Sequence, residues 1–289
     1  MKPKIINLDQ INGLRMKGKK MILWFEERPF IFFGYRIGYS SIKDLTLSAL
    51  SLHNETLNFW THFLSALWIL TELIQVLHLY FTGAATGSAT ILVKPRNLMY
   101  LLSGQLGMFF CLFSSSLYHL YKDRGATWCQ RLLQLDQLGI VTVTFLQAFI
   151  GIQLAFSKHG AYGDAIFLFV SLLFLLNLAL MTLPCSSSSA APAHCQSLKV
   201  ACIIAMIAFL FCVFMAWYFL FATKEEIDLF FYKMLLSYGI LGLAFFFYRT
   251  KYPERLFFMR NEKYSEGVRW FIETFTQSHI LWHILITVQ

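Results

Sequence analysis

The stretch Leu198-Lys-Val-Ala-Cys-Ile-Ile-Ala-Met-Ile-Ala-Phe-Leu-Phe-Cys-Val-Phe-Met-Ala-Trp-Tyr-Phe-Leu-Phe-Ala222 contains a single charged residue, Lys199. A helix of about 20 apolar residues crosses the ~30 Å hydrocarbon core of a bilayer. Lipid offers no hydrogen-bond partners, so a spanning segment must satisfy its backbone internally. The stretch therefore predicts a transmembrane helix.

Similar apolar runs recur along the chain. The 289 residues are 57% hydrophobic and 14% charged, whereas a soluble domain is about a quarter charged. The runs are solid blocks without the alternating polarity of barrel strands, which indicates helices. We expect an all-α bundle of seven transmembrane helices: Thr56 to Tyr80, Leu98 to Tyr121, Leu132 to Phe156, Ala165 to Leu183, Leu198 to Ala222, Leu229 to Tyr248, and Trp270 to Gln289.

The basic residues predict the orientation of these helices. With the N-terminus in the cytoplasm, the extracytoplasmic loops hold only Lys94, Arg96, Lys158, Lys224 and Lys233, which leaves 19 of the 24 Lys and Arg on the cytoplasmic side. An excess of cytoplasmic Lys and Arg is typical of membrane proteins. We expect a cytoplasmic N-terminus and an extracytoplasmic C-terminus, opposite to a G-protein-coupled receptor. The net charge of +8 then reflects membrane sidedness and not nucleic-acid binding.

The N-terminal part differs from the rest. Residues 1–55 are polar or broken and predict a cytoplasmic segment, and residues 56–289 form the transmembrane domain. The run from Met21 to Phe33 is too short to span and has the character of an amphipathic segment on the membrane surface; Phe32 and Phe33 could equally form a small packed contact.

Cys185 and Cys195 lie in a predicted cytosolic loop, where we expect no disulfide.

Ionisable side chains inside the predicted spans are candidates for function, because charge in lipid is unfavourable. His279 and His283 are four residues apart and share one helix face, so their ring nitrogens can converge on one metal ion. The expected topology brings His119 and Asp136 to the same side of the membrane, although His279 lies deeper in its span than His119. The full set is Glu72, His78, His119, Asp136, Glu273, His279 and His283; Glu72, His78 and Glu273 are more typical of rim or interfacial positions.

Three histidines around Zn²⁺ would leave a fourth position for water, as in catalytic zinc sites. Zinc lowers the pKa of such a water to about 7. Asp136 could accept the proton of that water, or could instead hold a histidine tautomer. Ser115, one turn before His119, could donate to an oxyanion, or could bond to a carbonyl of its own helix.

These residues resemble the progestin and adipoQ receptor family, which includes adiponectin-receptor-like and haemolysin-III-related proteins. The resemblance extends from about Gly34 to Ile286, and it rests on motifs in the family's order and spacing. They are Phe33-Gly-Tyr-Arg36, Ser51-Leu-His-Asn-Glu-Thr-Leu-Asn-Phe-Trp-Thr-His62, Ser115 with His119, Asp136, Pro253-Glu-Arg255, and Ser278-His279 with His283.

The resemblance implies a seven-helix receptor with zinc near the inner leaflet, held by His119, His279 and His283, with Asp136 and Ser115 beside the zinc-bound water. It implies a membrane lipid ligand, ceramide-like or sterol-like, and a protein hormone or signalling partner, in the plasma membrane or in the Golgi or endoplasmic reticulum. Asn54, Glu55 and Trp60 would have structural roles at the start of helix 1.

Two functions follow as expectations. In one, the protein is a signalling receptor whose zinc site hydrolyses a lipid amide, as a ceramidase does. In the other, it is a non-catalytic receptor or membrane scaffold in which zinc ties helices together. A pore or transporter is disfavoured because the sequence shows neither paired broken helices nor charged rings.

Overall fold

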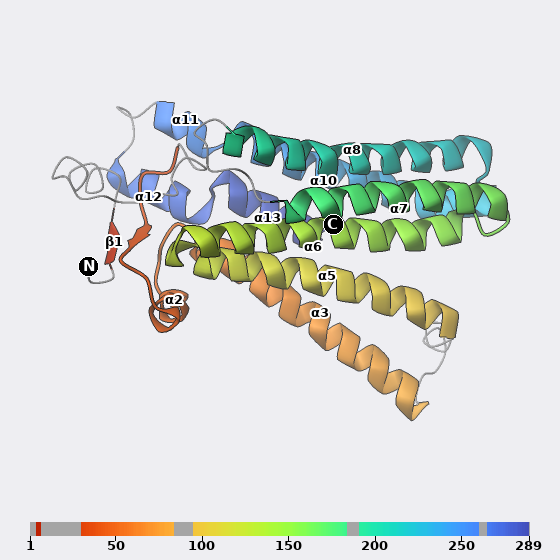
Figure 1. The fold of residues 1–289 in the computed structure, drawn as a ribbon, viewed down its shortest axis with the longest axis horizontal. Coiled ribbons are helices and arrows are strands. Elements are labelled where there is room, and N and C mark those ends of the chain that lie inside the picture. The colour runs from red at the N-terminus through yellow and green to blue at the C-terminus, as the bar shows by residue number, and fades with distance from the viewer. Residues whose placement is uncertain (1–3, 7–29, 84–94, 184–190, 260–264, 289) are drawn as a thin grey trace. The chain divides into compact units, whose positions relative to one another are not determined.

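The computed structural model describes residues 4–6, 30–83, 95–183, 191–259 and 265–288 (Figure 1). The described chain is almost wholly helical. Two short strands, β1 (Lys4–Ile6) and β2 (Tyr35–Ile37), pair antiparallel with Ile5 opposite Arg36. The helices are α2 (Ile42–Ser48), α3 (Thr56–Thr82), α5 (Pro95–Tyr121), η2 (Lys122–Arg124), α6 (Ala126–Ala155), α7 (Gly160–Thr182), α8 (Ala191–Leu220), α9 (Lys224–Glu226), η3 (Ile227–Phe231), α10 (Tyr232–Thr250), α11 (Glu254–Met259), α12 (Glu266–Phe275) and α13 (Ser278–Val288).

Six helices in the described part of the chain are long and apolar enough to cross a membrane. They are Thr56–Thr82, Pro95–Arg124, Ala126–Ala155, Gly160–Thr182, Cys195–Leu220 and Lys224–Leu256. Each contains most of one predicted span, which confirms an integral, multi-pass helical membrane protein.

The seventh predicted span is not one continuous helix. Between Trp270 and Gln289 the structure has two helices, α12 and α13, which are interrupted at Thr276 and Gln277. The Gln277 side chain donates to the carbonyls of Asn54 (2.7 Å) and Glu273 (2.9 Å), so it is buried at the break. α13 therefore begins late, at Ser278, one residue before the first histidine of the pair.

The chain divides into two compact units. The first comprises Met1–Ser65, Phe113–Leu133 and Ser237–Gln289, and the second comprises Ala66–Leu112 and Gln134–Leu236. The first unit thus contains the start of α3, the end of α5 and all of α11 to α13. The predicted division into a cytoplasmic segment (residues 1–55) and a transmembrane domain (residues 56–289) rests on residue composition and not on compactness, and it stays a prediction.

The second unit is built on close helix packing. A core of Val141, Met181, Ile203 and Met206 joins α6, α7 and α8. α6 also approaches α5 at Gly139, where an added Cβ would lie 2.8 Å from the Cα of Cys111. Small residues at such crossings let membrane helices come into backbone contact, which supplies packing energy that lipid does not.

The first unit ties the N-terminal segment to the helices. Gly34 has φ +83°, and its carbonyl accepts a hydrogen bond from the amide of Asn54 (3.1 Å). The amides of Phe32 and Phe33 both donate to the carboxylate of Glu273 on α12. Phe32 and Phe33 thus belong to a packed contact, and Glu273 is buried rather than an interfacial charge. Residues 21–29 of the expected amphipathic segment lie outside the described residues.

Gly139→Ala tests the contact between α5 and α6. We expect this substitution to lower the thermal midpoint of the detergent-purified protein, because the new methyl group meets backbone atoms that cannot move aside. Gly151→Ala on the same helix is the matched control, since nothing lies within 4 Å of its added Cβ. That control should be neutral or stabilising, by up to about 1 kcal/mol. Equal melting of the two variants would show that α5 and α6 are not in backbone contact at Gly139.

Candidate metal centre

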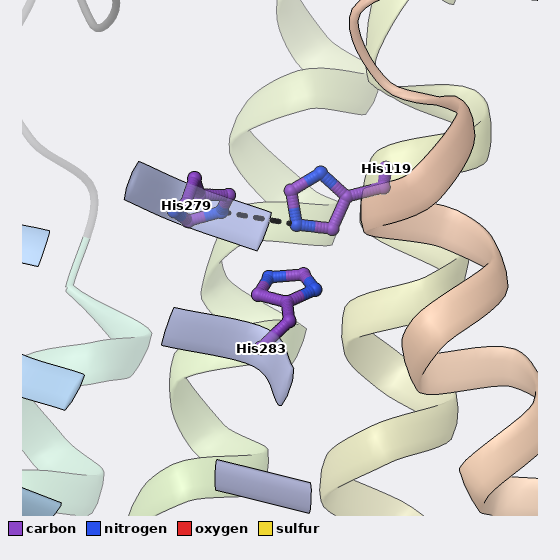
Figure 2. A group of neighbouring side chains, drawn as sticks. All are labelled: His119, His279 and His283. Atoms are coloured by element: carbon purple, nitrogen blue, oxygen red, sulfur yellow. Dashed lines mark hydrogen bonds between the residues drawn. The ribbon is translucent and has the colours of Figure 1, made fainter. Parts of the chain in front are cut away.

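The structure brings His119 of α5 together with His279 and His283 of α13 (Figure 2). One ring nitrogen from each lies within 4.8 Å of the others, and the Nε2 atoms of His119 and His279 are 3.3 Å apart. Two nitrogens that each lie ~2 Å from one tetrahedral zinc ion are about 3.3 Å apart. His119 and His283 are each only 1% exposed. The cluster can hold a metal ion.

The tautomer of His119 follows from its neighbour. Its Nδ1 lies 2.8 Å from Oε2 of Glu55. A carboxylate can only accept a hydrogen bond, so Nδ1 carries the proton and Nε2 presents its lone pair to the other two histidines. A carboxylate behind a ligating imidazole is the usual arrangement at metal sites, where it orients the ring and raises its basicity.

His283 has the same tautomer for a similar reason. Its Nδ1 lies 3.1 Å from the carbonyl oxygen of Asn58 and 3.3 Å from Oγ1 of Thr61. The carbonyl can only accept, so Nδ1 donates and the lone pair that could bind a metal is on Nε2. The first two turns of α3 thus orient ligands on two other helices, α5 and α13.

Arg36 anchors the end of α5 that carries His119. Its guanidinium donates to the carbonyls of His119 (2.8 Å) and Leu120 (3.1 Å). It also pairs with Asp123 at 2.7 Å. The last carbonyls of a helix have no partner within the helix, so the guanidinium both satisfies them and fixes the position of the His119 backbone.

Glu254 anchors the start of α13. One carboxylate oxygen accepts from the amide of Ser278 (2.7 Å), and the other accepts from the Ser278 hydroxyl. Glu254 is 4% exposed. A carboxylate at a helix N-terminus satisfies an unpaired amide and interacts favourably with the helix dipole. This contact fixes where α13 begins, and with it the positions of His279 and His283.

A fourth histidine lies against the cluster. The ring of His62 stacks on that of His283, with centroids 3.6 Å apart and planes within 9°. An imidazole binds a metal through a lone pair in its own plane, and one ion cannot lie in two parallel planes 3.6 Å apart. His62 is therefore a packing neighbour of His283 and not a ligand of the same ion. Among the described residues neither of its nitrogens has a hydrogen bond of ordinary geometry.

His53 lies just before α3, outside the spanning helices, and is neutral. Burial, with Arg36 nearby, lowers its pKa from 6.5 to about 3. Its Nε2 lies 3.1 Å from the carbonyl of Ser48, and the amide of Glu55 donates to its Nδ1 at 3.0 Å. This imidazole thereby fixes the backbone that presents the Glu55 carboxylate.

The remaining predicted residues occupy different places. Ser115 is buried on α5, one turn before His119. Asp136 is half-buried on α6 in the second compact unit, and its role beside a metal stays a prediction. On α3, neither Glu72 nor His78 is buried. Cys195 is disulfide-bonded, so the expectation of no disulfide at this residue was wrong; Cys185 lies outside the described residues.

Glu55, Asn58, Arg36 and Glu254 are site residues whose contacts were not expected. Glu55 was expected to have only a structural role, and the roles of Asn58 and Glu254 were not identified. The available signal was their charged or amide character within the motifs that carry the family resemblance. Trp60 does have a structural contact, since its Nε1 donates to the carbonyl of Ala49 (2.8 Å).

Comparison with known proteins agrees with these motifs. Residues 50–288 match the family described as haemolysin-III related. Heptahelical transmembrane protein 3 of Arabidopsis thaliana is 27% identical over 202 residues, 60% of this chain and 58% of that protein. Heptahelical transmembrane protein 1 of the same plant is 27% identical over 129 residues, 44% and 37% of the two chains. Membrane progestin receptor gamma-A of Danio rerio is 52% identical over 46 residues, 16% and 13%. The chain thus spans little more than half of the longest-matched relative.

Glu254→Ala tests the anchor of α13. We expect a loss of stability of about 1 kcal/mol, because the amide and hydroxyl of Ser278 lose their acceptor, together with weaker metal binding. The measurements are the thermal midpoint without metal and the metal content after dialysis. Glu225→Ala, at an exposed residue of α9, is the control. Unchanged values for Glu254→Ala would show that α13 is positioned by other contacts.

His62→Phe tests the exclusion of His62 as a ligand. Phenylalanine keeps a flat ring against His283 and removes both nitrogens, so we expect wild-type metal content. His283→Phe, its matched partner in the stack, should lose most of the bound metal. Metal per protein, measured by elemental analysis of detergent-purified protein, distinguishes the two. Loss of metal in His62→Phe would make His62 a ligand.

Proposed function

Because this chain belongs to the haemolysin-III-related family, we propose that it is a zinc-binding membrane receptor whose site hydrolyses a lipid amide of the ceramide type. The observation that supports the proposal is the convergence of three imidazoles, two of them with an acceptor behind Nδ1 that holds the ring in the Nδ1–H tautomer. Three neutral nitrogen ligands are typical of catalytic zinc, which keeps one position open.

His119, His279 and His283 would hold the metal. The donor set fits zinc, since it consists of nitrogen ligands that suit a tetrahedral ion. When bound, zinc supplies a Lewis acid and activates water at neutral pH. The histidines come from α5 and α13 and not from one contiguous segment, so binding also ties these two helices together.

The chain's own groups would do the remaining work. Asp136 would accept a proton from water and later donate it to the leaving amine, and Ser115 would donate a hydrogen bond to the developing oxyanion. The substrate would enter sideways from the lipid, because the ligands come from apolar helices. The N-terminus would face the cytoplasm, in the plasma membrane or in the Golgi or endoplasmic reticulum.

A second function is favoured by one observation. The residues that match membrane progestin receptor gamma-A do so at 52% identity over 46 residues. A non-catalytic receptor for a sterol-like lipid, or one that answers to a protein hormone or signalling partner, would use the same three histidines as a structural clamp. Both functions require the metal, but only the first requires Asp136 as a proton acceptor.

Asp136→Asn separates the two functions. The purified full chain would be loaded with zinc, and the release of fatty acid from a short-chain ceramide would be measured. We expect Asp136→Asn to keep its zinc and thermal midpoint while turnover falls by about 10²–10⁴-fold. His119→Ala should lose zinc and turnover together.

Three outcomes decide between the functions. If the zinc-loaded wild type cleaves no lipid amide, the non-catalytic receptor is the function that remains. If Asp136→Asn cleaves the ceramide at the wild-type rate, Asp136 is not the proton acceptor. A wild-type protein that binds no zinc contradicts both functions.

A further inference from the structure

We propose that Glu55 is a positioning residue for the metal ligand His119 and that its carboxylate, shared with Lys122, sets the metal affinity of the site. The inference rests on the metal binding proposed above. One carboxylate oxygen of Glu55 lies 2.8 Å from Nδ1 of His119, and the other lies 2.6 Å from Nζ of Lys122.

The carboxylate is held so that it cannot turn away from His119. Asn58, one turn along α3, donates to Oε2 of Glu55 at 3.0 Å. Lys122 holds the opposite oxygen, and its ammonium also lies 5.4 Å over the ring of Tyr118. Glu55 is 2% exposed. A buried carboxylate with partners on both oxygens keeps one orientation, and here that orientation points at Nδ1 of His119.

The electrostatics give this contact a direct effect on the ligand. A carboxylate that accepts from Nδ1–H draws that proton toward itself and leaves more electron density on Nε2, which binds a metal more strongly. Lys122 acts against this by drawing density toward the other oxygen. The Lys122 charge also compensates the buried carboxylate, which would otherwise be strongly unfavourable. Lys122 thus stabilises the fold, whereas Glu55 also acts on the metal.

The position of Glu55 in the fold explains how its side chain can hold the ring of His119. Its carbonyl accepts from the amide of Phe59 (3.0 Å), so Glu55 lies immediately before α3 and caps its first turn. A carboxylate there is favoured by the helix dipole. Arg36 holds the backbone carbonyl of His119 at the same time. Both ends of the His119 residue, backbone and ring, are therefore fixed from the segment that precedes and opens α3.

The test compares Glu55→Gln with Lys122→Met in the full chain purified in detergent. Cobalt(II) affinity is measured by competition with a chromogenic chelator, and the visible absorption bands of bound cobalt report the ligand field. Glutamine keeps the size of the side chain but loses its charge, so we expect about 10–100-fold weaker binding and shifted cobalt bands. Lys122→Met should lower the thermal midpoint of the metal-free protein but leave cobalt affinity equal or higher.

The results that would overturn the inference differ from the one that would overturn the proposed function. If both variants lose affinity in proportion to their loss of stability, the network is structural only and the inference is wrong. Wild-type affinity and bands in Glu55→Gln also overturn it. If wild type binds no cobalt or zinc, the proposed function fails instead. Should Glu55→Gln not be recovered folded, Glu55→Asp, which retracts the carboxylate but keeps its charge, should weaken binding, and unchanged affinity there would overturn the inference.

Discussion

An oxygen that can only accept a hydrogen bond determines the chemistry of this site. The carboxylate of Glu55 and the carbonyl of Asn58 each face Nδ1 of a histidine, so each forces the proton onto that nitrogen. The lone pairs of His119 and His283 are thereby on Nε2 before any metal binds. The start of α3 and the residue before it supply none of the three ligands, yet they fix the tautomer of two of them.

Anchors at helix ends give the ligands their positions. Arg36 binds the final carbonyls of α5, and Glu254 binds the first amide of α13. A helix end buried without partners would be unfavourable, so these contacts are required by the fold as well as by the site. The break at Gln277 belongs to the same arrangement, because it lets α13 begin one residue before His279. The ends of α5 and α13 and the positions of the three histidines therefore depend on the same contacts.

Much of the site was predictable, and the limits have physical reasons. The spacing of His279 and His283 places them on one helix face, and the motif of His119 supplied the third member. The sequence places His279 deeper in its predicted span than His119, and the structure shows a break in that span, with α13 beginning only at Ser278. The carboxylate behind His119 was not predicted as such: that role was considered for Asp136, whereas Glu55 performs it across 64 positions of sequence.

The sequence by itself determined that the chain is a multi-pass helical membrane protein, because long, mostly apolar runs without alternating polarity satisfy their backbone in lipid as helices. It also determined which histidines were candidates, since ionisable groups in such runs need partners. Only the tertiary structure decided which nitrogen of His119 and of His283 carries the proton, that the last predicted span is two helices, and that His62 stacks on His283 without being a ligand of the same ion. These features depend on distances between groups far apart in the chain, which no local pattern encodes.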